Sequence, residues 1–268
     1  MAPGMAPATT RLFDEILEEI FLRLPSPEDL ARAATASPAF RRIITSRPFL
    51  RRFRELHPPP LLGFVTEGGT FQPATDPHHS APLARAFAAA ADFKYAGFVP
   101  KPDGGDFTDW THRDVRDGRV LLMCTRRRST STTAGVRHDP LSLTDKVFTV
   151  CDPVSRRSVL LPPIPVLDSA LQKEHGFVHE SGHKLVPAAA GDDVDDRDFR
   201  VICWASYVSS FVIFVFLSAA GRWCLHMHHA SREDNLVIVL DTSTMEFSTA
   251  TILFRRHMLL MDICLKRE

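Results

Sequence analysis

The 268-residue sequence is poor in tyrosine and tryptophan and carries no net charge. It contains 2 Tyr and 3 Trp beside 19 Phe, and its 32 basic residues are balanced by 32 acidic ones. This balance argues against a protein that binds nucleic acid or an anionic membrane through its overall charge. Phenylalanine has no polar atom that needs a partner, so its abundance indicates apolar cores or grooves.

The sequence also lacks the features of a secreted protein. Its five cysteines are scattered, odd in number and without a C-x-x-C pair. This pattern is typical of a reduced intracellular protein, and we expect it in the cytoplasm, the nucleus or both. The first residues, MAPGMAPATT, contain no basic segment followed by an apolar one, as a signal peptide would. We expect residues 1–10 to form a short disordered tail.

Known catalytic motifs are missing as well: there is no G-x-S-x-G elbow, glycine-rich phosphate loop or dinucleotide fingerprint. Three histidines have the spacing of helical metal ligands, but nearby glycines favour a polar surface segment: His175, His179 and His183. His226 and His228 share a strand face but lack a third ligand. We therefore predict no catalytic residue, cofactor or metal, and a metal enzyme is the most distant alternative.

Among the features that the sequence does contain, the first is a pattern that predicts a series of short helices over residues 11–56. Within residues 12–24, apolar side chains recur at helical spacing on one face: Leu12, Ile16, Leu17, Ile20, Phe21 and Leu24. Charged residues fill the opposite side: Asp14, Glu15, Glu18, Glu19 and Arg23. Pro25 ends this helix.

Three serine-containing joints open the next helices: Ser26–Pro27, Ser37–Pro38 and the Ser-Arg-Pro at 46–48. In the first joint, Asp29 stands where the carboxylate of a capping box reaches back. The arginines between residues 41 and 54 have no interleaved stacking aromatics on the same face, which favours a solvated helical face over a nucleic-acid surface.

The helical pattern gives way to strands further along the chain. Residues 57–90 mix Gly, Pro, His and Ala, and we expect a linker there with a candidate short helix at APLARAFAAAA. In residues 91–268, β-branched and aromatic runs predict six strands: 118–124, 146–152, 157–163, 199–205, 210–218 and 235–241. The uncharged run 201–221 is long enough to span a membrane, but its serines and central break favour a buried hairpin.

Three strand ends share one arrangement, in which a strand, a small or acidic residue, a turn and a second strand follow one another. Asp152, Ser218 and Asp241 hold the same place in it. Such hairpins are typical of the outer strands of propeller blades. The spacing from Ser218 to Asp241 is too short for a whole blade. The predicted fold is α+β and multidomain, with a small all-α module followed by a mostly antiparallel β-rich domain that resembles an incomplete β-propeller.

Residues 12–53, LFDEILEEIFLRLPSPEDLARAATASPAFRRIITSRPFLRRF, closely resemble the F-box motif. Phe13, Ser37 and Phe40 stand where that family usually has proline, cysteine and tryptophan. Later segments are similar to the F-box-associated, propeller-like region of plant F-box proteins: HPPPLLGF, RDVRDGRVLL, VCDPVSRRSVLLPPIP and FVFLSAAGRW. The chain is thus identified as a shortened member of that family.

The resemblance implies a Skp-type adaptor as partner and, through it, the cullin scaffold of a ubiquitin ligase. It implies that eleven residues form or support the adaptor-binding surface: Leu12, Phe13, Ile16, Leu17, Ile20, Leu24, Pro25, Leu30, Phe40, Ile43 and Ile44. Four short helices in about 45 residues cannot cover all their apolar side chains alone, which agrees with a docking surface. The β-rich domain would select an unknown protein substrate.

Two other hypotheses remain beside this substrate receptor. One is a shortened F-box protein that binds the adaptor but has no substrate output. The other is a protein anchored in a membrane through residues 201–221. The favoured hypothesis includes neither nucleic acid nor a membrane as partner.

Overall fold

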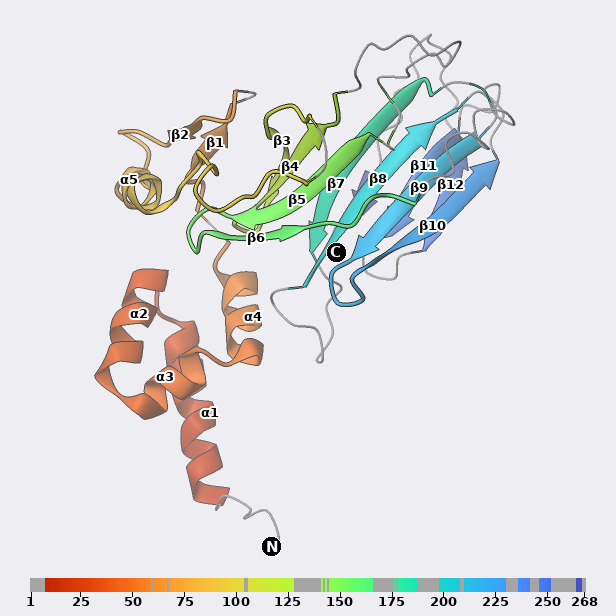
Figure 1. Cartoon of the computed structure of the whole chain (residues 1–268). Helices are drawn as coiled ribbons and strands as arrows, with labels where there is room; N and C mark the ends of the chain where they lie inside the picture. The colour runs from red at the N-terminus through yellow and green to blue at the C-terminus, as the bar shows by residue number, and fades with distance from the viewer. Residues whose placement is uncertain are drawn as a thin grey trace, which may run out of the picture. The chain divides into compact units, whose positions relative to one another are not determined.

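The computed structural model divides the chain into two compact units, residues 1–61 and residues 62–268 (Figure 1). It describes residues 8–58, 60–66, 68–103, 106–127, 141, 143, 145–165, 176, 178–187, 198–207, 210–229, 236–241, 246–251 and 264–266. The boundary falls near the start of the segment expected as a linker, 57–90, so that most of this segment belongs to the second unit.

The first unit contains four helices: α1 (Ala8–Leu22), α2 (Pro27–Ala36), α3 (Pro38–Ile44) and α4 (Arg47–Leu56). The predicted starts of the last three helices are confirmed. Helix α1 begins at Ala8, inside the stretch expected as a tail, since no proline or glycine interrupts the chain between Pro7 and Leu22. Residues 1–7 lie outside the described residues.

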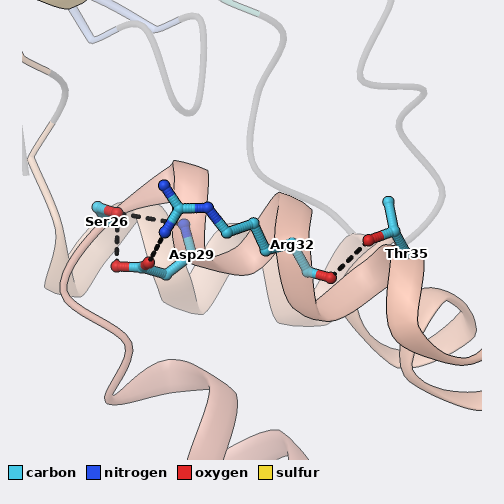
Figure 2. Close-up of polar contacts among 4 residues, drawn as sticks. All are labelled: Ser26, Asp29, Arg32 and Thr35. Carbon is cyan, nitrogen blue, oxygen red and sulfur yellow. Dashed lines mark hydrogen bonds and ion pairs between the residues drawn. The ribbon is translucent and has the colours of Figure 1, made fainter.

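Two of the serines cap the helices that follow them. The Ser26 Oγ accepts a hydrogen bond from the Asp29 backbone N–H at 3.2 Å, and the same hydroxyl donates to Asp29 Oδ2 at 2.8 Å (Figure 2). Asp29 also accepts a hydrogen bond from Arg32 at 2.9 Å. The Ser37 Oγ accepts from the Ala39 N–H, whereas Ser46 precedes α4 without a side-chain hydrogen bond to it. Asp29 reaches back to the cap residue as predicted, but its carboxylate accepts from the Ser26 hydroxyl in place of the backbone N–H that a capping box uses.

The four helices enclose a small core of their own. Its buried side chains come from every helix: Phe21, Leu22, Leu30, Ile43, Ile44, Phe49 and Phe53. The ring of Phe21 meets that of Phe40 edge-on, with 5.1 Å between the centroids, and His57 Nε2 lies 2.9 Å from the Leu22 carbonyl oxygen. These contacts hold α1 against α3 and against the residue that follows α4.

The second unit contains two four-stranded antiparallel sheets in which the strands pair in sequence order. The first consists of β3 (Thr111–Arg116), β4 (Arg119–Thr125), β5 (Lys146–Asp152) and β6 (Arg157–Leu160). The second consists of β7 (Glu180–Pro187), β8 (Phe199–Ser206), β9 (Ser210–Leu217) and β10 (Arg222–His229).

Two smaller sheets complete the part of this unit that the structure describes. One pairs β1 (Gly63–Val65) with β2 (Phe71–Pro73). The other has the order β12 (Phe247–Thr251), β11 (Leu236–Asp241), β13 (Cys264–Lys266), and its β13 runs parallel to β11. Among the described residues no sheet closes on itself. All six predicted strands are present, with ends shifted by at most three residues.

Strands β8 and β9 are buried on both faces. On one face Cys203, Phe214 and neighbouring apolar residues pack against Leu121 and Phe148 of the first sheet. On the other face β8 and β9 pack against β11 and β12 through Ile202, Ile213, Val215, Leu240 and Phe247. Strands covered on both sides read as continuous apolar runs, which explains the uncharged stretch 201–221.

The predicted buried hairpin is therefore confirmed at 201–221. No helix among the described residues is long and apolar enough to cross a membrane.

Described residues between 62 and 110 cover the remaining face of the first sheet. Tyr95 and Val99 pack against Val120 and Leu122 of β4 in a separate apolar cluster. The same region contains α5 (Ala81–Ala90), at the predicted short helix. Three rings link α5 and β2 to this cover: Phe71 lies 5.2 Å from Phe87 and 4.9 Å from Phe93 between centroids. The segment expected as a linker is thus packed, because the outer apolar face of a sheet must be covered.

Residues 180–183 of the histidine-rich segment belong to strand β7, whereas His179 is exposed, as expected of a polar surface segment. His183 is half-buried, with its ring centroid 4.8 Å from that of Phe148, so the expectation of a surface position was wrong for His183. His175 lies outside the described residues. In the part of the chain that the structure describes, no three His, Cys, Asp or Glu side chains come together as metal ligands would.

The repeated hairpin arrangement is present, but its residues have different contacts. Asp152 Oδ1, between β5 and β6, accepts hydrogen bonds from the backbone N–H groups of Val154 and Ser155 at 2.9 and 3.1 Å. The Ser218 hydroxyl, between β9 and β10, accepts from the Phe199 N–H at 2.8 Å. Asp241 ends β11, and the turn after it lies outside the described residues.

Candidate functional site

Helix α1 carries a stripe of exposed apolar side chains, which we name the α1 stripe: Phe13, Ile16 and Ile20. Their exposed fractions are 70%, 53% and 52%. At 3.6 residues per turn they fall within an arc of about 60° around the helix. Leu17 and Phe21, next to this arc, pack on the helical core. Helix α1 therefore has two neighbouring apolar faces, one turned to its own core and one left to solvent.

A shallow concavity lies along the α1 stripe and is lined by Glu15, Ile16, Glu19, Ile20 and Arg23. Its apolar side chains and its charges of both signs resemble the core and rim of a protein–protein interface. The sequence placed Glu15, Glu19 and Arg23 on the side opposite the apolar face, and this was wrong. Their spacing of four residues, one position from Ile16 and Ile20, could have shown that they border the stripe.

Ion pairs connect α1 to the two later helices α3 and α4. Arg52 of α4 donates to Glu18 Oε1 at 2.8 Å and to Glu19 Oε1 at 2.6 Å, and Arg42 of α3 donates to Asp14 Oδ2 at 2.7 Å. The hydrogen bond from Arg52 to Glu19 and, to a smaller extent, the one to Glu18 raise the pKa of the Arg52 guanidinium above its usual value. Exposed pairs of this kind add little stability, and α1 is held in place mainly by the packing of Leu17, Phe21 and Leu22 on the helical core.

The eleven residues implied by the resemblance separate by burial. Four are exposed: Phe13, Ile16, Ile20 and Pro25. Three are half-buried at the edge of the helical core: Leu17, Leu24 and Phe40. Three are buried within it: Leu30, Ile43 and Ile44. The side chain of Leu12 lies outside the described residues. The exposed group is left to solvent, and the other two groups belong to the helical core.

In a comparison with known protein families, residues 10–52 match the F-box domain. The matched segment contains the α1 stripe, its ion-pair partners and most of the helical core. The predicted resemblance to an F-box is confirmed for these residues. Neither the curated proteins nor the solved structures compared with the chain gave a match.

Proposed function

We propose that the chain is the substrate receptor of a Skp–cullin–F-box ubiquitin ligase. In this role the helical unit binds a Skp-type adaptor, the adaptor connects it to a cullin, and the second unit binds a target protein. The chain supplies no catalytic group. It holds the target near a ubiquitin-charged enzyme and so raises the effective concentration of the two reactants. We propose the cytoplasm, the nucleus or both as its place of action.

The observation that carries this proposal is the exposed α1 stripe inside the F-box match. Three large apolar side chains on one helical face are costly to leave in water, and a partner that covers them gains their burial. A standard interface buries roughly 1,600 Å² and draws most of its energy from a few such anchors. Phe13, where the family usually has proline, adds an exposed ring to this contact area.

We further propose that the second unit is a propeller-like F-box-associated region of the plant type. Its two four-stranded antiparallel sheets, stacked face to face through one core, support this proposal. The first strands of both sheets are linked, because Asp114 Oδ2 of β3 accepts a hydrogen bond from the Leu185 N–H of β7 at 2.9 Å. The loops between strands would then select the target.

Adaptor binding tests the proposal directly. We would measure the affinity of the full chain for a purified Skp-type adaptor by calorimetry, and compare it with the double variant Ile16→Glu, Ile20→Glu. Each anchor is expected to be worth about 2 kcal/mol, so the double variant, which loses about 4 kcal/mol, should bind roughly 1,000-fold more weakly. Leu56→Glu is the matched control, because Leu56 is 61% exposed on α4 but lies outside the stripe. Failure of the unaltered chain to bind any such adaptor would contradict the proposal.

A second measurement separates the receptor from an adaptor-binding protein without substrate output. The complete ligase would be reconstituted on the chain and supplied with proteins that co-purify with its second unit. Ubiquitination of such a protein, lost in the Ile16→Glu, Ile20→Glu variant, is the result we expect. Adaptor binding without ubiquitination of any co-purified protein would favour the alternative.

A further inference from the structure

The two large sheets of the second unit have four outer strands, and three of these carry features that discourage pairing with another chain. An outer strand presents unpaired backbone N–H and C=O groups, which proteins protect with bulges, hydrogen-bonding side chains, prolines or short strands. Strand β3 contains a bulge between His112 and Asp114, and Asp114 accepts a hydrogen bond from the outward Leu185 N–H of β7. Strand β6 is four residues long and is followed by Pro162 and Pro163.

Strand β10, the fourth outer strand, has none of these features. Among the described residues it pairs with β9 alone (Figure 1). Its sequence, RWCLHMHH, contains no proline and no lysine, and its pairing with β9 runs over eight residues without a shift of register. Arg222, at its first position, is its only residue charged at neutral pH. A long and regular edge of this kind is a template for a further strand.

The register of the sheet shows which backbone groups of β10 point outward. The Tyr207 N–H donates to the Ser210 carbonyl oxygen at 2.8 Å, so these residues form a hydrogen-bonded pair between β8 and β9. Because such pairs alternate along an antiparallel ladder, even-numbered residues of β9 bond to β8 and odd-numbered ones bond to β10. Odd-numbered residues of β9 lie opposite even-numbered residues of β10. The backbone groups of Trp223, Leu225 and Met227 therefore point toward the free edge.

The side chains of the same three residues form an apolar row on the face that meets the first sheet. Trp223 packs on the core there, 5.3 Å from Phe216 between ring centroids, and its Nε1 donates to the Pro162 carbonyl oxygen at 2.8 Å. Leu225 and Met227 follow at alternate positions and are 42% and 37% exposed. The free edge thus combines outward backbone groups with a partly covered apolar row.

We propose that β10 pairs antiparallel with β10 of a second copy of the chain, across a two-fold axis at Leu225. In this register Leu225 meets its own equivalent, and Trp223 meets Met227 of the partner subunit on both sides of the axis. The three hydrogen-bonded pairs supply about six backbone hydrogen bonds, and the two ring–sulfur contacts are favourable. Arg222 lies opposite position 228, a histidine, so no like charges meet at neutral pH.

The second copy fits this edge because the pairing is symmetric, so that one contact covers the same outward groups of both chains. The paired strands contribute about seven residues a side, fewer than the roughly 20–30 of a standard interface, so we expect a dissociation constant in the micromolar range. Pairing through β10 involves the second unit alone and does not depend on the proposed function.

Sedimentation velocity of the full chain over the micromolar range tests this pairing. The unaltered chain should form dimers. Leu225→Lys and Leu225→Glu each place like charges face to face on the axis and should each weaken the dimer at least about tenfold. An equimolar mixture of the two variants should dimerise again, because position 225 then meets the opposite charge. Leu160→Lys, at a residue 44% exposed on β6, is the matched control and should leave the dimer unchanged.

A cysteine pair tests the register. Position 226 lies opposite Cys224 of the partner subunit in a non-hydrogen-bonded pair, whose Cα atoms are about 4.5 Å apart and within reach of a disulfide. In a Cys264→Ser background, oxidation of His226→Cys should therefore give a covalent dimer on a non-reducing gel. The control Cys224→Ser, His226→Cys should give none.

Several outcomes would overturn the proposal: an unaltered chain that stays monomeric, Leu225 variants that dimerise as the unaltered chain does, a mixture that does not recover, or no covalent dimer from His226→Cys. The variant Ile16→Glu, Ile20→Glu should keep the dimer, because the α1 stripe belongs to the other unit. Loss of the dimer in that variant would assign the contact to the α1 stripe and contradict pairing through β10. Adaptor binding is measured separately, so a failure of the proposed function leaves this result unchanged.

Discussion

Helix α1 of the first unit and strand β9 of the second are both rich in large apolar side chains, but these side chains are buried to different extents. In β9, seven of eight residues are buried, because a sheet of the same unit packs on each face. In α1 only one apolar face meets the unit's own core, and the α1 stripe stays exposed. A hydrophobic surface that the chain does not cover itself is available for a partner.

The comparison also separates stability from binding. Apolar residues of the second unit are expected to contribute to its folding, whereas those of the α1 stripe are expected to contribute to association. Similar substitutions should therefore lower the stability of the protein in the second unit and its affinity for a partner in the α1 stripe. Four predictions follow, from the largest expected effect to the smallest.

The largest effect is expected for Phe148→Ala in the core of the second unit. Phe148 is 1% exposed and lies between two sheets, so its truncation should lower the free energy of unfolding of this unit by about 3–5 kcal/mol. Val159→Ala on β6 is the matched control, because Val159 is 48% exposed and its change should stay within about 0.5 kcal/mol. Urea denaturation measures both, and equal effects would remove the contrast between core and surface.

Acid should weaken the second unit through His183. Burial, followed by the positive charges of Lys146 and Arg113, lowers the pKa of His183 from 6.5 to about 3, and its Nε2 has no hydrogen-bond partner among the described residues. Because the unfolded chain binds a proton more readily, stability falls as the pH drops from 6.5 toward 3, by about 1.4 kcal/mol per pH unit.

Denaturation at several pH values between 7.5 and 5 measures this slope. His183→Leu should flatten it, whereas His79→Leu, at an exposed histidine, should leave it unchanged. An identical slope in both variants would show that His183 is not its source.

A smaller effect is expected at the start of α2. Ser26→Ala removes the hydrogen bond to the Asp29 N–H and should cost the helical unit about 1 kcal/mol. Ser46→Ala is the control, because Ser46 caps α4 without a side-chain hydrogen bond and its loss should cost much less. Thermal denaturation of the two variants should therefore differ, and equal melting temperatures would contradict the role of the Ser26 cap.

The smallest effect on stability is expected for Phe13→Ala. The ring is 70% exposed, so its removal should change the free energy of unfolding by less than about 0.5 kcal/mol. The affinity for the adaptor should nevertheless fall about tenfold, as for the loss of one moderate interface anchor. Phe49→Ala, at a fully buried position of the same unit, should unfold it instead. A Phe13 variant as unstable as the Phe49 variant would show that the stripe belongs to the core.

Sequence patterns predicted the helical unit closely because its boundaries depend on neighbouring residues. The serine–proline joints at residues 26–27 and 37–38 set helix starts through contacts within three residues, as Ser26 and Asp29 show. Strand β7 was missed because ESGHKLVP has no continuous apolar run. Its Gly182 has a tertiary reason, since a Cβ there would collide with the ring of Trp204 on the neighbouring strand. No pattern within β7 could reveal that contact.

The sequence by itself determined where the helices begin, which segments form the main strands, and that α1 has more apolar surface than one face requires. Only the tertiary structure decided which of these side chains are buried. Leu17 and Ile20 both belong to the apolar pattern of α1, yet Leu17 packs on the core and Ile20 is 52% exposed. The reason is that periodicity records the chemistry of a helix face, whereas burial depends on which elements pack against it, and these come from distant parts of the chain.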